Sequence, residues 1–481
     1  MDEAVAIDEV KKFIAQRDLD AATRYVPPVV TPTRAGGFDQ KIAIIGAGPA
    51  GLSCAFYLAE KGYKPVVFEK NERPGGMLTY GIPSFKLQKD VIEAEVEIIR
   101  LMGAEFRYGV EVGRDVTLDE LREQGFKAFY VAIGCQGGRL AGIPGEDAEG
   151  VTVAVDFLRE VNSGKIDALP GRTIVVGGGN VAIDVARNAC RLGSEHVEMF
   201  CLESEAQMPA SEEERREAIE DGAHISCGWA KEVHLDEAGR VCGITFKRCT
   251  RVFDDEGRFA PEYDENDLRR VDAYRVVMSI GQSIVWGDLL AGSKVELGRG
   301  QGALADPQTY QTAEPDIFVG GDVYTGPSFA IDAIAAGHEA AVSIHRFVQP
   351  GSTLTIGRNQ RRYTALDRDD VVIESYDNAS REVAHMDRER EKAAPFSEYV
   401  ETFTEEQVRA ETARCLGCGA SIVDPNKCIG CGLCTTKCAF DAIHLDRDRP
   451  ECSTMVKYEQ KLPSLGKYAL KRAIKIKFGK K

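Results

Sequence analysis

The sequence predicts an α/β protein with two sheets of parallel strands and a small cysteine-rich α+β unit close to its C-terminus. Three observations support this prediction. An apolar run, a glycine-rich turn and a helix-like segment follow one another at residues 41–61, and the same pattern returns at residues 172–193. Six cysteines fall within residues 415–438. Alternation of strand-like and helix-like segments favours parallel sheets that are covered by helices.

The length and composition indicate a folded protein of several domains. A chain of 481 residues exceeds what one hydrophobic core usually supports. The acidic N-terminus has no signal-peptide pattern, and the charge-free stretch 42–59 contains a glycine turn and Pro49, which fit a strand and a helix better than a membrane span. We therefore expect a cytoplasmic protein, whose 14 cysteines have metal, redox or packing roles instead of forming disulfides.

The charge is unevenly distributed along the chain. A formal net charge of −16 argues against a general nucleic-acid partner. Residues 455–481 hold nine Lys and Arg and a single Glu, so a basic tail follows an acidic body. We expect an acidic protein surface to dock on this tail; the alternative is a solvated tail without a partner. The apolar residues of the tail fit either a helix or a strand.

The first glycine turn has the features of a dinucleotide site. The apolar run Lys41–Ile45 leads into GAGPAG and a helix-like segment. Gly46 permits a tight turn, Gly48 lets the backbone approach a pyrophosphate, and Gly51 permits close helix packing. A second apolar run ends in Glu69, where a carboxylate can accept hydrogen bonds from ribose hydroxyls. Strand, turn, helix and acid in register predict a bound dinucleotide.

The second glycine turn repeats the pattern. The apolar run Arg172–Val176 leads into GGGNVAIDVARNACRLG, with Gly177, Gly179 and Ala182 at the three key positions. The two turns begin 131 positions apart, which suffices for one domain to end before another begins. The chain is therefore predicted to hold two dinucleotides.

Two further stretches make a family resemblance specific. NERPGGMLTYGIPSFKL follows Glu69, and PDIFVGGDVYTGPSFAIDAIAAGHEAA begins near residue 315. The combination resembles the FAD-dependent reductases with two dinucleotide domains. It is most similar to the branch that contains the small subunit of glutamate synthase, the flavin region of dihydropyrimidine dehydrogenase and the large subunit of the bifurcating transhydrogenase. The resemblance extends from about Lys41 to Phe347.

The resemblance implies two Rossmann-like dinucleotide-binding domains. The nicotinamide domain would be inserted in the FAD domain, because the Gly-Gly-Asp strand returns after the second glycine turn. The first turn would bind the FAD pyrophosphate, Glu69 the ribose, Gly76–Leu78 the flavin and Asp322 the ribityl chain. A helix that starts near Ala333 would direct its N-terminus at the flavin pyrimidine edge. The implied FAD-binding residues are Gly46, Gly48, Pro49, Ala50, Gly51, Glu69, Gly76, Met77, Leu78, Gly134, Gly321, Asp322 and Ala333.

The nicotinamide domain departs from the NADP-using members of that branch. Those members end its second strand in an Arg pair that binds the 2'-phosphate, whereas this chain has Leu202 and Glu203. A carboxylate repels a phosphate and accepts from a free 2'-hydroxyl, so we expect NAD(H) over NADP(H). The alternative is that Glu203 faces solvent and another basic residue binds the phosphate. The expected nicotinamide-binding residues are Gly177, Gly179, Asn180, Val181, Ala182 and Glu203.

The cysteine-rich segment has the spacing of a bacterial ferredoxin, C-x2-C-x2-C-x3-C, at Cys428, Cys431, Cys434 and Cys438. It predicts a ferredoxin-like α+β iron-sulfur domain with a 4Fe-4S cluster; structural zinc is the alternative. Seven thiols are candidate ligands where two clusters would want eight. One cluster is therefore expected, and a second would need a non-cysteine ligand or a more distant cysteine. The candidate metal ligands are Cys415, Cys418, Cys428, Cys431, Cys434, Cys438 and Cys452.

The expected domains follow from these motifs. They are an N-terminal helical extension (1–39), the first part of the FAD domain (40–149), the NAD(H) domain (150–281), the second part of the FAD domain (282–348), a charged connector (349–414) with a helix near residues 405–414, the iron-sulfur domain (415–454) and the basic tail (455–481). Related disulfide reductases carry a redox cysteine pair beside the flavin, whereas this chain has Gly75, Gly76 and Met77 there. Electrons must therefore leave the flavin by another route.

We expect an FAD-dependent NAD(P)H oxidoreductase with an iron-sulfur acceptor and no catalytic side chain of its own. It would pass electrons between NAD(H) and a ferredoxin or the partner catalytic subunit of a multisubunit oxidoreductase, and the resemblance alone raises flavin-based bifurcation. One alternative is the NADPH-oxidising small subunit of a glutamate synthase. An alternative of another class is a nucleotide-sensing assembly subunit with structural zinc.

Overall fold

The computed structural model describes residues 4–30, 38–204, 207–349, 351–356, 358, 379–415, 428–437, 443–445 and 458–478. The chain divides into two compact units. The first comprises residues 1–356 and 372–416, and the second comprises residues 357–371 and 417–481. Both parallel sheets belong to the first unit, while the cysteine run and the C-terminal helix belong to the second.

The first parallel sheet has the strand order β15-β4-β1-β2-β3. Its strands are β1 Lys41–Ile45, β2 Val66–Glu69, β3 Glu105–Tyr108, β4 Phe126–Val131 and β15 Ile317–Val319. Successive side chains of β1 enter different cores: Ile42 and Ile44 pack under helices α2 (Pro49–Glu60) and α10 (Ala330–Val348), whereas Ile45 packs with Leu289 on the other face. Burial on both faces explains why the strands read as continuous apolar runs.

The second parallel sheet has the order β6-β13-β7-β8-β9. Its strands are β6 Val151–Val153, β7 Arg172–Val176, β8 His196–Cys201, β9 Ala223–Cys227 and β13 Arg275–Met278. All of them lie between β4 and β15 in the chain, so the expected insertion of one domain into the other is confirmed. The two connections between the domains pair with each other, because β5 (Gly137–Gly138) is antiparallel to β14 (Gln282–Ser283).

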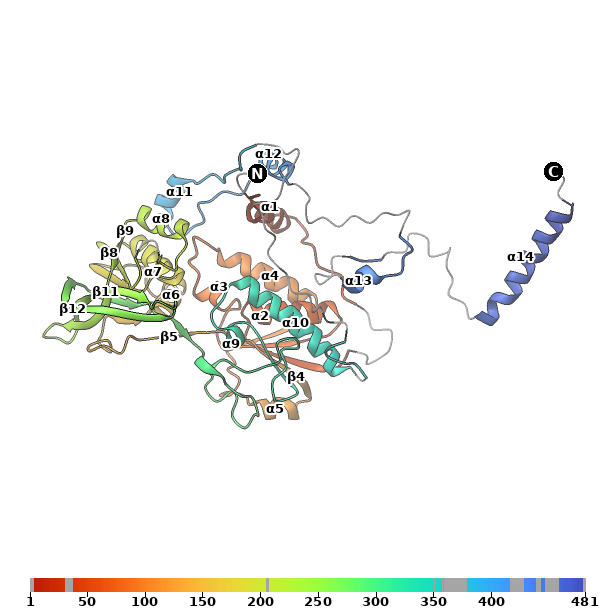
Figure 1. Ribbon diagram of the computed structural model, residues 1–481, viewed down its shortest axis with the longest axis horizontal. Helices are drawn as coiled ribbons and strands as arrows, with labels where there is room; N and C mark the ends of the chain where they lie inside the picture. Colours follow the sequence, from red (N-terminus) through yellow and green to blue (C-terminus); the bar gives the residue numbers. More distant parts are fainter. Residues whose placement is uncertain are drawn as a thin grey trace. The chain divides into compact units, whose positions relative to one another are not determined.

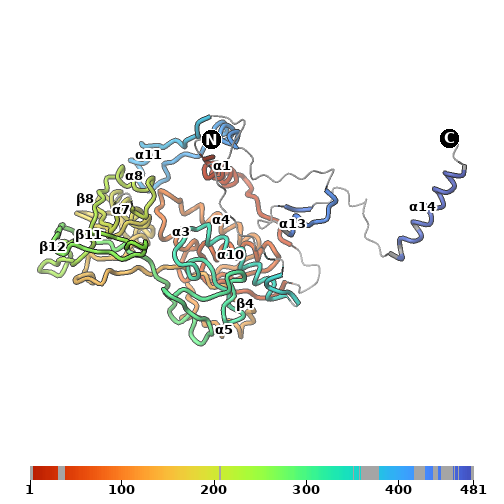
Figure 2. Tube along the Cα trace, viewed as in Figure 1, coloured from red at the N-terminus to blue at the C-terminus, as the bar shows by residue number. Residues whose placement is uncertain are grey.

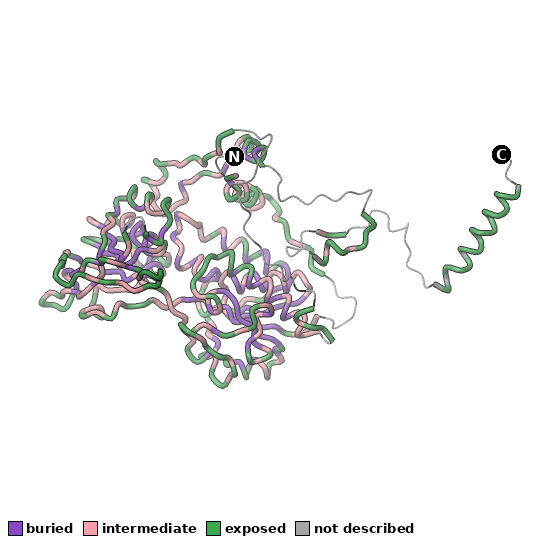
Figure 3. Tube along the Cα trace, in the orientation of Figure 1, coloured by how far each residue is buried: buried purple, intermediate pink, exposed green. Residues whose placement is uncertain are grey.

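The two faces of the second sheet are covered differently. Helices α6 (Ala154–Asn162), α7 (Asn180–Arg191) and α8 (Glu212–Glu220) cover one face. A three-stranded antiparallel sheet, β10 Trp229–Leu235, β11 Val241–Phe253 and β12 Phe259–Asp272, packs on the other (Figure 1). Phe200 of β8 stacks on Phe246 of β11 with ring centroids 3.6 Å apart. Figure 3 shows the buried residues concentrated in the two sheet regions.

Within the first unit, residues 379–415, which we call the strap, pack beside the N-terminal helix α1 (Ile7–Leu19). The strap contains α11 (Arg388–Ala393) and α12 (Glu405–Ala413), and Figure 2 shows it passing α8 and α1. Glu411 is fully buried; it accepts from the Ala6 and Glu382 amides, each at 2.8 Å, and from the guanidinium of Arg414. This part of the expected connector is therefore packed structure.

The first domain also contains α3 (Met77–Tyr80), α4 (Lys89–Leu101) and α5 (Leu118–Glu123), and three further helices complete the α-helices of the described residues. α9 (Asp322–Thr325) follows β15, and the second unit contains α13 (Leu433–Lys437) and α14 (Tyr458–Phe478). The described part of the basic tail, Tyr458–Phe478, thus forms a helix, whereas its sequence fitted either a helix or a strand. Wherever the structure describes the chain, its helices are too short or too polar to cross a membrane.

Candidate functional site

The first glycine turn is crowded at its ends and open in its middle. A Cβ on Gly46 would lie 2.5 Å from the carbonyl oxygen of Ala132, and one on Gly51 would lie 2.0 Å from that of Gly46. A Cβ on Gly48 would meet nothing within 4 Å. Gly48 caps α2 with Pro49 at its first position, and neither a capping side chain nor an acid occupies the first turn of the helix. The open amides of this helix end suit a pyrophosphate.

Glu69 lies at the end of β2 with only 3% of its surface exposed. Its Oε2 accepts from the Ala47 amide at 2.8 Å, and its Oε1 accepts from the backbone and side-chain amides of Asn71 at 2.9 and 2.6 Å. Oε2, which accepts only one of these hydrogen bonds, has a further lone pair for a ribose hydroxyl. The acid therefore shapes its own loop and can also hold a ligand.

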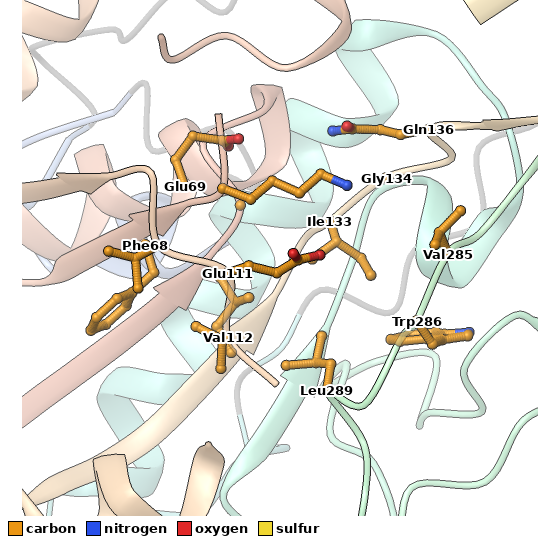
Figure 4. A pocket seen from close by; sticks show the side chains of 14 residues that line it. Phe68, Glu69, Glu111, Val112, Ile133, Gly134, Gln136, Val285, Trp286 and Leu289 are labelled. Carbon is orange, nitrogen blue, oxygen red and sulfur yellow. The ribbon is translucent and has the colours of Figure 1, made fainter. Parts of the chain in front are cut away.

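A pocket of about 500 Å³ of empty space opens beside Glu69. Figure 4 shows its lining: Phe68 and Glu69 come from the end of β2, Gly134 from the segment after β4, and Trp286 and Leu289 from the segment after β14. Gly134 thus lies where an adenosine half could reach it. No local sequence pattern marks Trp286 as a lining residue, because the lining comes from segments far apart in the chain.

The remaining FAD-binding candidates converge on the same turn. A Cβ on Gly76 would lie 3.0 Å from Gly48 Cα, and one on Gly321 would lie 3.0 Å from Ala50 Cβ. Asp322 begins α9, and burial raises the pKa of its carboxyl group. Helix α10 begins at Ala330, three positions before Ala333, which is 9% exposed. The structure thus brings Gly76, Gly321 and the start of α10 together around the first glycine turn, and we call this arrangement the cradle.

Lys89 braces the segment that carries Met77 and Leu78. Its Nζ donates to the Leu78 and Ile82 carbonyl oxygens at 2.8 and 2.5 Å. Burial, and to a smaller extent the charge of Arg73, lowers the pKa of Lys89 to about 8. Sequence reasoning missed this residue, because lysine at a helix start gives no sign of the carbonyls that it meets.

The second glycine turn repeats the geometry of the first. A Cβ on Gly177 would lie 2.2 Å from the carbonyl oxygen of Ser279, whereas one on Gly179 would meet nothing within 4 Å. Gly179 caps α7, whose first turn carries no acid. Ala182 is fully buried in the core beneath the turn. The turn therefore also leaves room for a pyrophosphate at a helix end.

A hollow of about 1100 Å³ of empty space runs past this turn. Asn180, Val181 and Glu203 are among its lining residues. The Glu203 carboxylate reaches the turn, since a Cβ on Gly178 would lie 3.2 Å from its Oε2. The complete lining is Gly138, Ala154, Val155, Gly177, Gly178, Gly179, Asn180, Val181, Leu202, Glu203, Pro209, Trp229, Phe259, Ser279, Ile280, Gly281, Gln282 and Pro327.

Phe85 and Lys86, in the stretch GIPSFKL, join the two domains. The Phe85 ring centroid lies 4.8 Å and 4.2 Å from the guanidinium carbons of Arg187 and Arg191 on α7. Lys86 Nζ lies 2.6 Å from Asp184 Oδ1 and also contacts Glu214. Burial raises the pKa of Asp184 to about 6, although Lys86 lies beside it. A buried cation-aromatic contact and an ion pair thus hold α7 against the first domain.

The cysteine ligands are described only in part. Cys428, Cys431 and Cys434 are exposed, as is Cys415 at the end of the strap, while Cys418, Cys438 and Cys452 lie outside the described residues. Among the residues with described positions, no three Cys, His, Asp or Glu side chains come together as a metal site. Elsewhere, burial raises the pKa of the Cys135, Cys190 and Cys201 thiols to about 12, so these side chains remain protonated.

Comparison with known families gives two matches. Residues 40–337 match the family described as pyridine nucleotide-disulphide oxidoreductase. Residues 421–444 match the family described as 4Fe-4S binding domain, which agrees with the ferredoxin spacing of the cysteine run. The expected resemblance, fold class and cofactor types (FAD, a pyridine nucleotide and a 4Fe-4S cluster) are confirmed.

Several curated proteins are similar to this chain. It is 34% identical to the beta subunit of NADP(+)-dependent formate dehydrogenase from Moorella thermoacetica, over 87% of this chain and 62% of that protein. It is 34% identical to the small chain of NADPH glutamate synthase from Escherichia coli, over 72% and 75%. It is 30% identical to the beta subunit of NADPH-Fe(3+) oxidoreductase from Geobacter sulfurreducens, over 79% and 61%. The chain thus spans about three fifths of the first and third of these relatives.

Solved structures share the fold. FprA from Mycobacterium tuberculosis, in its complex with NADPH, aligns with a TM-score of 0.55 at 19% identity, over 64% of this chain and 85% of FprA. Thioredoxin reductase from Lactococcus lactis aligns with a TM-score of 0.50 at 19% identity, over 64% and 99%. At this identity the likeness concerns the arrangement of the two domains in the fold and nothing finer.

Proposed function

We propose that this chain, which belongs to the pyridine nucleotide-disulphide oxidoreductase family, is an electron-transfer subunit of a larger oxidoreductase. Electrons would pass between NAD(H) and a ferredoxin or a partner subunit by way of FAD and the 4Fe-4S domain. Bound flavin exchanges a hydride with a nicotinamide and single electrons with a cluster. The names of the relatives, which are subunits of formate dehydrogenase, glutamate synthase and an Fe(3+) oxidoreductase, support this proposal.

One observation carries the proposal: a single unit holds two glycine turns, each open at its middle glycine, and a 4Fe-4S binding domain follows in the same chain. The residues of the first turn would hold the FAD pyrophosphate at the start of α2. Those of the second turn would hold the nicotinamide dinucleotide at the start of α7. Gly75–Met77 place no thiol beside the first turn, so the acceptor must lie elsewhere, and the cysteine run supplies one.

The test is anaerobic spectroscopy of the purified chain. Addition of NADH should bleach the flavin absorption and then the cluster absorption, and a low-potential reductant should drive the reduction of NAD. A Cys431→Ser variant should retain the flavin step and lose the cluster step. A matched control, Cys242→Ser, changes a half-buried thiol outside the cysteine run and should retain both. No bleaching by NADH, together with no reduction of NAD by the low-potential reductant, would remove the proposal, and zinc in place of iron would favour the nucleotide-sensing alternative.

We also propose a preference for NAD(H), which rests on Glu203. Its carboxylate lines the hollow beside the glycine turn, and the described lining contains no Lys or Arg to neutralise a 2'-phosphate. The names of the three relatives mention NADP or NADPH, so the proposal separates this chain from them. Comparison of kcat/KM for NADH and NADPH tests it. A higher value for NADPH in the unchanged chain would show that Glu203 does not set the preference.

The glutamate synthase reading remains a second candidate, since the E. coli small chain is matched over 75% of its length. Co-purification separates the two hypotheses: the large chain of a glutamate synthase favours the second candidate, and a formate dehydrogenase or ferredoxin partner favours the main proposal. A partner with an acidic surface would dock on α14, the helix within the basic tail. A cytoplasmic location remains a prediction.

A further inference from the structure

The tip of the β11–β12 hairpin presents an exposed aromatic ring to the second hollow. Phe259 begins β12, is 63% exposed and lines the hollow together with the glycine turn. It pairs across the hairpin with Phe253, the last residue of β11, and the two ring centroids are 6.3 Å apart in an edge-to-face arrangement. Because this contact covers little of the ring, packing within the hairpin does not account for an exposed phenylalanine beside a ligand site.

The position of the ring along the hollow can be fixed from its neighbours. Leu202 and Glu203 follow β8, the second strand of the domain, where the adenosine ribose of a dinucleotide lies. Trp229, which also lines the hollow, packs on the cluster of Leu202, Cys249 and Val252. Val252 directly precedes Phe253, so the hairpin tip belongs to this end. The other end is marked by Gly138 and Gln282 in the paired connections to the first domain.

The chemistry of this end suits a flat uncharged ring. Two aromatic side chains, Trp229 and Phe259, face the hollow beside the single carboxylate of Glu203, and none of the described lining residues is basic. A purine base offers a π-face to such rings, and its ribose offers hydroxyl groups to the acid. Among the described residues that line the hollow, a phosphate would find no cation.

We propose that Phe259, supported by Trp229, stacks on the adenine ring of the pyridine nucleotide, so that the hairpin tip covers the adenosine half of the ligand. This inference rests on the proposed function, because it assigns a residue to the same dinucleotide. It adds a specificity element that is outside the glycine turn and that comes from the antiparallel sheet. Phe253 contacts the Phe259 ring edge-to-face and is not among the residues that line the hollow.

The test compares ligands with and without adenosine. Dissociation constants of ADP-ribose, NADH and reduced nicotinamide mononucleotide are measured by anaerobic calorimetry with the unchanged full chain and with Phe259→Ala. Both proteins are loaded with flavin and reduced beforehand, so that no hydride transfer adds heat to the binding. Loss of one base-aromatic contact should weaken ADP-ribose and NADH about tenfold. The affinity for reduced nicotinamide mononucleotide, which has no adenosine, should stay unchanged. Phe259→Tyr, which keeps a π-face, should restore the affinity.

The control is Leu268→Ala, which removes a half-exposed apolar side chain from the same strand away from the hollow. It should leave all three affinities unchanged, and thermal unfolding should show that both alanine variants are folded. Equal binding of NADH by the unchanged chain and Phe259→Ala would overturn the inference while leaving the proposed function intact. An equal loss for all three ligands would also overturn it, since it would indicate a distorted hairpin. If the unchanged chain bound none of the three, the proposed function itself would be wrong.

Discussion

The two glycine turns of the first unit differ in how closely their helices pack on them. In the first turn the third key position is Gly51, where any Cβ would lie 2.0 Å from a backbone oxygen. In the second turn the same position is Ala182, whose methyl group is buried in the core. The first helix therefore meets its turn backbone against backbone, and the second meets it through a side chain. One motif thus allows two packing distances.

The acidic residues that follow the two turns, Glu69 and Glu203, likewise differ in how closely they pack against the protein. Both Glu69 oxygens accept hydrogen bonds from the protein, and the side chain is 3% exposed. Glu203 is half-buried, and its carboxylate lies beside the second turn in the open hollow. The first site is therefore part of its domain core, whereas the second can be altered with little effect on the fold.

The largest expected effect is that of Gly51→Ala. The added methyl group meets a backbone carbonyl that cannot rotate away, so we expect a loss of about 3 kcal/mol or more, with a lower Tm and a lower FAD content. The matched change in the second domain, Ala182→Gly, should lower stability by only about 1 kcal/mol and leave the FAD content unchanged. Thermal unfolding and the ratio of flavin to protein absorbance measure both. A Gly51→Ala protein with the unchanged Tm would refute the difference in packing.

The second expected effect concerns the strap, which holds the second domain through buried arginines. Asp221 accepts from Arg187 at 2.7 Å and from Arg191 at 2.9 Å, and Arg191 also reaches Glu391 of the strap. Removing the carboxylate in Asp221→Ala leaves two buried cations short of a partner and should lower the free energy of unfolding by about 3 kcal/mol. Denaturant titration measures this.

Its control is the neighbouring acid. Glu220 pairs with Arg388 of the strap in the open, with side chains 45% and 48% exposed, so Glu220→Ala should change stability by less than about 0.5 kcal/mol. Comparable losses for the two variants would mean that burial of the arginines is not what ties the strap to the domain.

The third effect separates the two acids. Glu69→Gln keeps the size of the side chain but replaces the carboxylate whose oxygens accept hydrogen bonds from the Ala47 and Asn71 amides. This change should lower the free energy of unfolding by about 2 kcal/mol and reduce FAD retention. Glu203→Gln should change stability by less than about 0.5 kcal/mol and shift the ratio of kcat/KM values towards NADPH. Equal stability losses would contradict the view that only the first acid belongs to a core.

The features that the sequence predicted are those with a local pattern. The two glycine turns, Glu69, Glu203 and the cysteine run are each defined within a few neighbouring residues. The antiparallel sheet β10–β12 was not predicted, because alternating polar strands with many charges read as surface segments. The strap was predicted as a charged connector for a similar reason. Its sequence suggests that Glu411 is solvated, because the donor that pairs with it, the Ala6 amide, lies 405 positions away. The aromatic lining at Trp229 and Phe259 likewise depends on contacts between segments that only the fold brings together.

The smallest effect is a pH dependence that belongs to the first domain. The pKa of Lys89 is lowered to about 8 in the folded chain, from 10.5 in the unfolded chain, because burial disfavours its charge. Between these values the unfolded state binds more protons, so the contribution of Lys89 to stability rises as the pH increases from about 8 to 10.5 and is lost as the pH falls again.

Lys89→Met removes this titration together with the hydrogen bonds to Leu78 and Ile82. The unfolding free energy of the unchanged chain should therefore increase relative to that of the variant by about 1 kcal/mol across the window, after allowance for partial solvent exposure. Denaturant titrations at pH 7.5 and pH 10 measure the difference. The charged ammonium group of Lys89 donates to the Leu78 and Ile82 carbonyl oxygens, and its deprotonation at high pH should weaken these hydrogen bonds. We therefore also expect the flavin absorbance to change over the same pH range. A constant difference between the two proteins would show that Lys89 is hydrated, and the first domain would then lack the buried charge that distinguishes its cradle from the open hollow of the second.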